Sequence, residues 1–104
     1  MTEQSIEQQI VAKNLTAPRL TPDAISAAIK AEAYYVFPGT TVTVCCLTLQ
    51  NGFCCIGESA CVSPENFDAD IGKQVAKEDA RRKIWALEGY LLCRRLAEER
   101  EAGG

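Results

Sequence analysis

The chain has 104 residues, of which 47% are hydrophobic and 24% charged, and its formal net charge is −3. This length suits one small domain with a modest core, and the composition is that of ordinary globular proteins. The acidic balance disfavours DNA or RNA as a partner, because sequence-independent binding to nucleic acid needs a basic surface. No apolar run approaches the roughly 20 residues that cross a bilayer, so we expect no membrane partner.

The N-terminal region predicts two helices joined by a linker. Thr2 is expected to cap a first helix over residues 2–13, which together with the linker forms a helical arm over residues 1–20. This arm is docked, swapped between subunits or frayed. Thr21, followed by proline and aspartate, predicts the start of a second helix, because threonine caps helices and proline is favoured at their first position. We expect that helix to end near Ala33.

A β-hairpin is predicted at the centre of the chain, with Asn51 and Gly52 at its tip. Asn-Gly favours a two-residue type I′ loop, in which both central residues need positive φ. Such a loop would place Cys45 opposite Glu58, and side chains would alternate between the two faces of the hairpin. The face expected to meet the helices carries Cys45, Leu47, Leu49, Cys54 and Ile56. The other face is also apolar, which predicts an oligomer interface at Val42, Val44, Phe53 and Cys55.

Six cysteines in a chain that begins without a secretory signal indicate reduced thiols in a cytoplasm. The two Cys-Cys pairs do not predict a metal site, because neighbouring residues of a strand point to opposite faces and no histidine is present. Cys46 and Cys55 would share a face only as diagonal neighbours, roughly 7–8 Å apart, which is too far for a disulfide. We therefore expect no metal and no cofactor.

A long amphipathic helix follows the hairpin and begins near Phe67 or Asp68. Gly72 and Gly89 are weak points, so the helix is continuous or kinked. Its buried stripe is expected to comprise Ile71, Val75, Ala80, Ile84, Leu87 and Leu91, extended by Trp85, Leu92 and Leu96.

The predicted fold class is therefore α+β, with N-terminal helices, one two-stranded antiparallel hairpin and a long C-terminal helix. Residues 21–99 form a single domain, and residues 100–104 form a frayed tail. A two-stranded sheet is only marginally stable alone, and the second hairpin face is apolar, so we expect a dimer or a higher homo-oligomer.

Basic residues recur at four-residue steps on the long helix, which indicates a site for a phosphate, a nucleotide or an acidic partner. Aromatic residues before the hairpin could stack on a base. The alternatives are a solvated helix face and aromatic cover for the core. The candidate ligand- or partner-binding residues are Lys73, Lys77, Arg81, Tyr34, Tyr35 and Phe37.

No catalytic residue is predicted. Without histidine, the base for a cysteine nucleophile would have to be Glu58 opposite Cys45, and a carboxylate beside a thiol opposes thiolate formation. Asp68 and Asp70 are two residues apart on a helix and are interpreted as caps. We therefore expect a protein that is not an enzyme.

Four short blocks, N-G-F, G-E-S-A-C, P-E-N-F-D and K-I-W, occur between Thr41 and Leu96. Together they resemble a family of small tailed-bacteriophage and prophage proteins, which is named after gene product forty-nine of one coliphage and gene sixty-six of a Shigella phage. Cys45 and Cys61 match cysteines of this family. Ala86 stands where family members tend to carry proline, which suggests a helix break near this position in those members.

The resemblance implies an accessory protein in the cytoplasm of an infected or lysogenic bacterial host, and it carries no catalytic residue over to this chain. Small phage accessory proteins often act by occupying a target. Our first hypothesis is therefore a binding protein that blocks a host or defence factor, or that sequesters a small anionic, nucleotide-like ligand. The second is a nucleic-acid-associated helper of phage replication or transcription, which the acidic charge disfavours.

Overall fold

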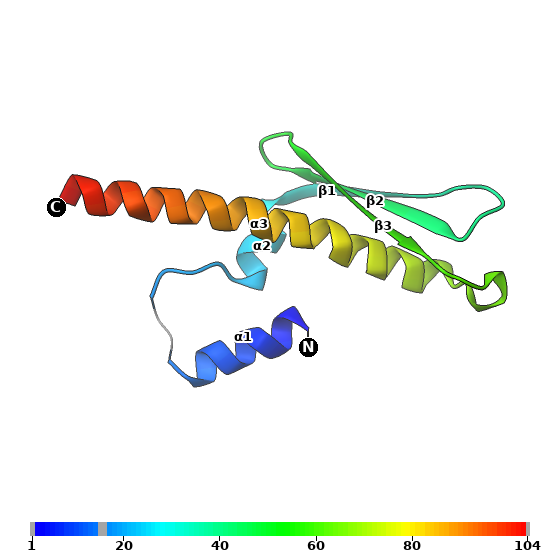
Figure 1. Ribbon diagram of the computed structural model, residues 1–104, viewed down its shortest axis with the longest axis horizontal. Coiled ribbons are helices and arrows are strands. Elements are labelled where there is room, and N and C mark those ends of the chain that lie inside the picture. The colour runs from blue at the N-terminus through cyan, green and yellow to red at the C-terminus, as the bar shows by residue number, and fades with distance from the viewer. Residues whose placement is uncertain (1, 15–16, 104) are drawn as a thin grey trace. The chain divides into compact units, whose positions relative to one another are not determined.

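The computed structural model describes residues 2–14 and 17–103, and the fold is α+β as predicted (Figure 1). These residues form two compact units. One comprises residues 28–84, and the other comprises the described residues on either side of that range. The elements in chain order are α1 (Glu3–Ala12), α2 (Pro22–Ala28), β1 (Ile29–Val36), β2 (Val42–Leu49), β3 (Cys54–Ala60), a short 3-10 turn (Pro64–Asn66) and α3 (Ala69–Gly103).

The sheet has three antiparallel strands in the order β1-β2-β3, whereas the sequence predicted two. The additional strand, β1, occupies residues that the predicted second helix was expected to cover as far as Ala33. That helix does start after Thr21, whose Oγ1 accepts a hydrogen bond from the Ala24 amide at 3.0 Å, but it ends at Ala28. Pairing with β2 overrides the helical propensity of the Ala, Lys and Glu residues in this segment.

The tip of the hairpin is closed by the pair of Leu49 and Phe53, which leaves three loop residues, 50–52, instead of the predicted two. Leu49 N donates to Phe53 O at 2.8 Å, and Gly52 N donates to Leu49 O at 2.9 Å. Gly52 has a φ of +90°, whereas the φ of Asn51 is negative. A type I′ loop needs positive φ at both central residues, so this hairpin adopts the three-residue alternative, in which a single glycine takes the left-handed conformation.

The three-residue loop shifts the register of β2 and β3 by one residue from the predicted register. Such a shift turns every side chain of a strand to the other face. Cys55 is therefore buried on the side of α3, at 4% exposure, and the prediction that it shares a face with Val42 and Val44 is wrong. Cys54 and Ile56 were predicted to meet the helices, and both are instead exposed on the opposite side.

The first part of α3 packs on one side of the sheet (Figure 1). Gly57 on β3 allows the close approach of helix and sheet. A Cβ atom at Gly57 would overlap the backbone of Ala76 and would lie 2.9 Å from the Ala80 Cα. Ala76, Ala80 and Ile84 are fully buried, as is Cys45, the partner of Gly57 in the register. Small residues on both elements therefore set the distance between helix and sheet.

The buried side of α3 differs from the predicted stripe, of which Ala80 and Ile84 are buried as expected. Glycine and alanine permit the closest packing, so Gly72 and Ala76 face the sheet in place of the adjacent larger residues. The helix begins after Asp68, whose Oδ1 accepts hydrogen bonds from the amides of the first turn, and it runs without a break to Gly103. The stripe residues that stay exposed are Ile71 at 60%, Val75 at 48%, Leu87 at 40% and Leu91 at 54%.

The N-terminal arm is docked within its unit. Thr2 caps α1 as predicted, because its Oγ1 accepts a hydrogen bond from the Ser5 amide at 3.1 Å. Trp85 Nε1 donates to Glu3 Oε1 at 2.6 Å. In addition, the Arg19 guanidinium binds both carboxylate oxygens of a second glutamate on α1, Glu7, at 2.6 and 3.0 Å. Polar contacts therefore hold α1, which buries no residue completely.

Candidate functional site

One side of the sheet is turned away from α3 (Figure 1). The apolar side chains on this side remain exposed or half-buried. Tyr35 is 55% exposed, and its ring meets the ring of Phe37 edge-on, with the centroids 4.9 Å apart. Contiguous exposed apolar surface of this kind marks interaction sites in soluble proteins. We call this surface the open sheet face and define it by Ala33, Tyr35, Val42, Val44, Cys46, Cys54 and Ile56.

The predicted oligomer-interface residues lie in three different places. Val42 and Val44 belong to the open sheet face. Phe53 lies in the loop before β3 and is 56% exposed, whereas Cys55 is buried on the side of α3. The open sheet face thus retains two of the four residues and gains Tyr35 from the strand that the sequence did not predict.

The predicted basic line on α3 lies beside β1, and its charges are already engaged. Lys77 Nζ forms an ion pair with Glu32 Oε2 at 2.8 Å. Lys73 Nζ lies over the ring of Tyr34, 5.8 Å from its centroid, which is a cation–π contact. Arg81 also interacts with another group. An anion approaching this line would therefore compete with partners within the chain.

The three candidate aromatic residues do not form one stacking platform. Tyr34 lies opposite Cys45 in the sheet, on the side that faces α3. Tyr35 lies on the open sheet face, because successive side chains of a strand alternate, and the ring of Phe37, which follows β1, contacts the Tyr35 ring. Of the three, Tyr34 is the residue that meets a lysine of the basic line.

Tyr34 lies between the Lys73 ammonium group, the ion pair of Glu32 with Lys77, and the thiol of Cys45. Tyr34 donates from its hydroxyl to Glu32 Oε1 at 3.2 Å. Burial raises the pKa of Tyr34 to about 12, and the neighbouring Cys45 and Glu32 contribute in the same direction. The hydrogen bond from Lys77 lowers the pKa of Glu32, and burial raises the pKa of the Cys45 thiol. At neutral pH the carboxylate is therefore charged, while the phenol and the thiol are neutral.

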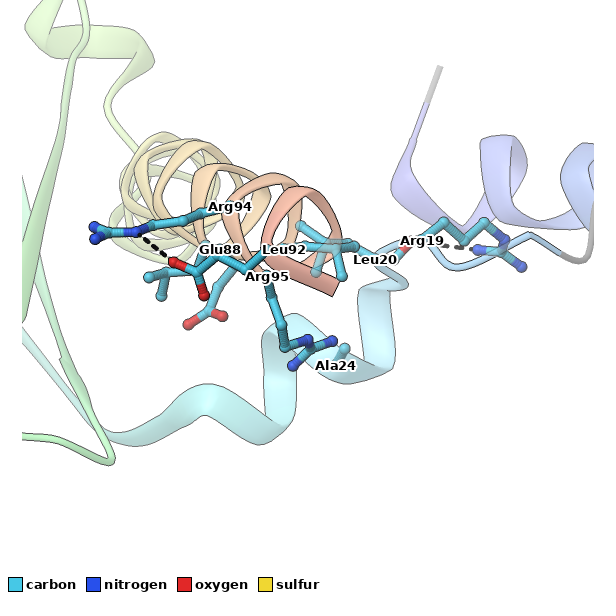
Figure 2. Close-up of a pocket in the computed structure, with 9 residues that line it drawn as sticks. Arg19, Leu20, Ala24, Glu88, Leu92, Arg94 and Arg95 are labelled. Carbon is cyan, nitrogen blue, oxygen red and sulfur yellow. Dashed lines mark hydrogen bonds and ion pairs between the residues drawn. The ribbon is translucent and has the colours of Figure 1, made fainter. Parts of the chain in front are cut away.

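A separate groove of about 670 Å³ lies within the unit that contains α2 and the second part of α3 (Figure 2). Three arginines line it, but Figure 2 shows Arg94 and Arg95 pointing in different directions. Arg94 pairs with Glu98 at 3.2 Å, and Arg19 is held by α1. The arginines do not converge on one anion, so we do not regard this groove as the principal site.

The cysteines are all free thiols, and Cys45, Cys46, Cys54 and Cys55 are distributed over both faces of the sheet. Among residues 2–14 and 17–103, no three His, Cys, Asp or Glu residues are grouped so as to hold a metal ion. In the same part of the chain, no helix combines the length and the hydropathy that a membrane crossing requires.

The fold and the site define a small α+β protein with an exposed apolar sheet face and, on the opposite side of the sheet, a line of engaged cations on α3. The chain belongs to the phage protein (N4 Gp49/phage Sf6 gene 66) family, which matches residues 20–96. This match confirms the resemblance that the sequence blocks indicated. No curated protein and no solved structure matches the chain.

The sequence patterns did not predict β1 or the contacts that it makes. The Tyr-Tyr-Val-Phe run from Tyr34 to Phe37 is rich in residues that favour strands, and it was the available signal for β1. The pair between Glu32 and Lys77 had no local signal, because the two residues are far apart in the sequence and meet only through tertiary packing.

Proposed function

We propose that this phage protein is an accessory factor that acts without catalysis, by binding a host or defence protein in the cytoplasm of the bacterium. The observation that carries the proposal is the open sheet face, where Tyr35 and Ile56 are 55% and 44% exposed. Exposed aromatic and aliphatic side chains on a rigid sheet are the kind of anchors that protein interfaces use. Membership of a phage protein family supports a bacterial host as the place where the protein acts.

The test compares the proteins captured from phage-infected cells by the wild type and by two variants. Ile56→Glu places a charge on the open sheet face and should abolish capture of the partner, because a carboxylate would be desolvated in the interface. Ile71→Glu is the matched control, because Ile71 is 60% exposed on α3, away from that face. Equal capture by both variants would remove the open sheet face from the proposal.

A small anionic ligand is the second candidate, and Lys73 is the observation that favours it. Its ammonium group contacts the Tyr34 ring but has no carboxylate partner among the described residues. A nucleotide-like ligand could be bound there by Lys73, with Lys77 exchanging Glu32 for the ligand. Native mass spectrometry of protein purified from infected cells should then show extra mass that the double variant Lys73→Glu, Lys77→Glu lacks. This candidate would be excluded if the wild type carried no mass beyond that of its own chains, or if the double variant carried the same extra mass.

A further inference from the structure

The two outer edges of the sheet differ in how their backbone groups are satisfied. On the β3 edge, the Glu58 amide donates to Asp79 Oδ2 at 3.0 Å, and the Ile56 carbonyl accepts a hydrogen bond from Lys83 Nζ at 2.5 Å. Both side chains come from α3. They occupy hydrogen-bonding positions that another strand would need, which is a common way of protecting a sheet edge.

The β1 edge has no such protection in the part of the chain that the structure describes. Phe37 N donates to Val42 O at 3.1 Å, so alternate residues of β1 direct their backbone groups toward β2. The intervening residues Glu32, Tyr34 and Val36 direct their N–H and C=O groups outward, where no described group binds them. No residue of β1 is buried. An edge of this kind is a template for a further strand.

We propose that β1 pairs in antiparallel fashion with β1 of a second copy of this chain, about a two-fold axis at Ala33. The pairing would join three strands from each copy into one continuous sheet. The hydrogen bonds would run between Glu32 and Tyr34 of opposite copies, whose backbone groups point outward. Such an interface is isologous, as the interfaces of most homodimers are.

The side chains of β1 favour this register. With the axis at Ala33, the large Tyr35 ring of each copy lies opposite the small Ala31 of the other, on the open sheet face. On the α3 side, Glu32 lies opposite Tyr34. An axis at Glu32 would instead place two carboxylates directly opposite each other, which is destabilising. An axis at Tyr34 would oppose two rings that each already contact Lys73.

A charge-reversal pair at Ala33 tests this proposal, which does not depend on the proposed function. Ala33 is exposed, so Ala33→Lys and Ala33→Glu should fold as the wild type does, with the same circular dichroism. Each variant alone places two like charges across the axis, and its native mass should fall to half the wild-type value. An equimolar mixture of the two variants places Lys opposite Glu and should restore the wild-type mass.

Ala60→Lys is the control, because Ala60 is an exposed alanine on β3 and should not alter the native mass. A monomeric wild type at its highest soluble concentration would overturn the proposal. It would also be overturned if Ala33→Lys kept the wild-type mass, or if the mixture failed to restore it. Ile56→Glu should keep the wild-type native mass while it loses the captured partner, because Ile56 lies on β3 and not at the β1 edge, and this result would separate self-association from partner binding.

Discussion

Gly57 on β3 and Ala80 on α3 approach each other so closely that no Cβ atom fits at Gly57. Such an atom would lie 2.9 Å from the Ala80 Cα, whereas carbon atoms in favourable contact are about 3.5–4.0 Å apart. It would lie closer still to two other backbone atoms, the Ala76 carbonyl oxygen and the Ala80 nitrogen. The helix must therefore move away from the sheet if Gly57 gains a side chain.

Gly57→Ala should consequently lower the free energy of unfolding by about 3 kcal/mol, at the upper end for overpacked cores, because the obstructing atoms belong to the backbone. Urea denaturation of both proteins measures this difference. Gly103→Ala is the control, since a Cβ atom there meets nothing within 4 Å. A Gly57→Ala protein as stable as the wild type would contradict the packing of α3 on the sheet.

The register of β2 and β3 predicts which cysteines react with an alkylating reagent. Cys54 and Cys93 are exposed and should be modified rapidly in the native protein. Cys45 and Cys55 are buried and burial raises the pKa of both thiols, so they should react only after unfolding. Peptide mass spectrometry after timed alkylation distinguishes the sites. A reactive Cys55 beside a protected Cys54 would favour a two-residue loop instead.

Tyr34 predicts a loss of stability at alkaline pH. Burial raises its pKa from 10.0 to about 12 in the folded protein. The resulting stabilisation is complete below the unfolded pKa and is lost as the pH rises through the folded value. Between these two pH values, Tyr34→Phe should therefore lose stability less steeply than the wild type in urea denaturation. Parallel slopes for the two proteins would contradict this environment for Tyr34.

The docking of α1 should weaken in acid. The hydrogen bond from Arg19 lowers the pKa of Glu7, so the stabilisation is present above the unfolded pKa and is lost as the pH falls through the folded pKa. Trp85, the single tryptophan, donates to Glu3 on the same helix and reports the change by its fluorescence. Glu7→Gln should show a smaller acid-induced change in Trp85 emission than the wild type does. An unchanged transition would show that this ion pair does not hold α1.

Short-range patterns in the sequence determined where the helices α1, α2 and α3 begin. The caps at Thr2, Thr21 and Asp68 depend on side chains bonding to amides within the next three residues, so the local sequence was sufficient. The same holds for the existence of a turn at Gly52, which needs a residue that tolerates positive φ. The family blocks likewise needed no tertiary information.

Tertiary structure decided that residues 29–36 form a strand and which faces β3 and most of α3 present. Residues 29–36 became a strand because β2 offers its backbone to them, and their own propensity did not require it. The hairpin register followed from one extra loop residue, which exchanged the environments of Cys54 and Cys55. The small residues of α3 pack on the sheet at Gly57, and Val75 stays exposed. Each outcome depends on contacts between residues that are distant in the sequence. A local sequence pattern does not contain the energy of such contacts, so it could not predict these outcomes.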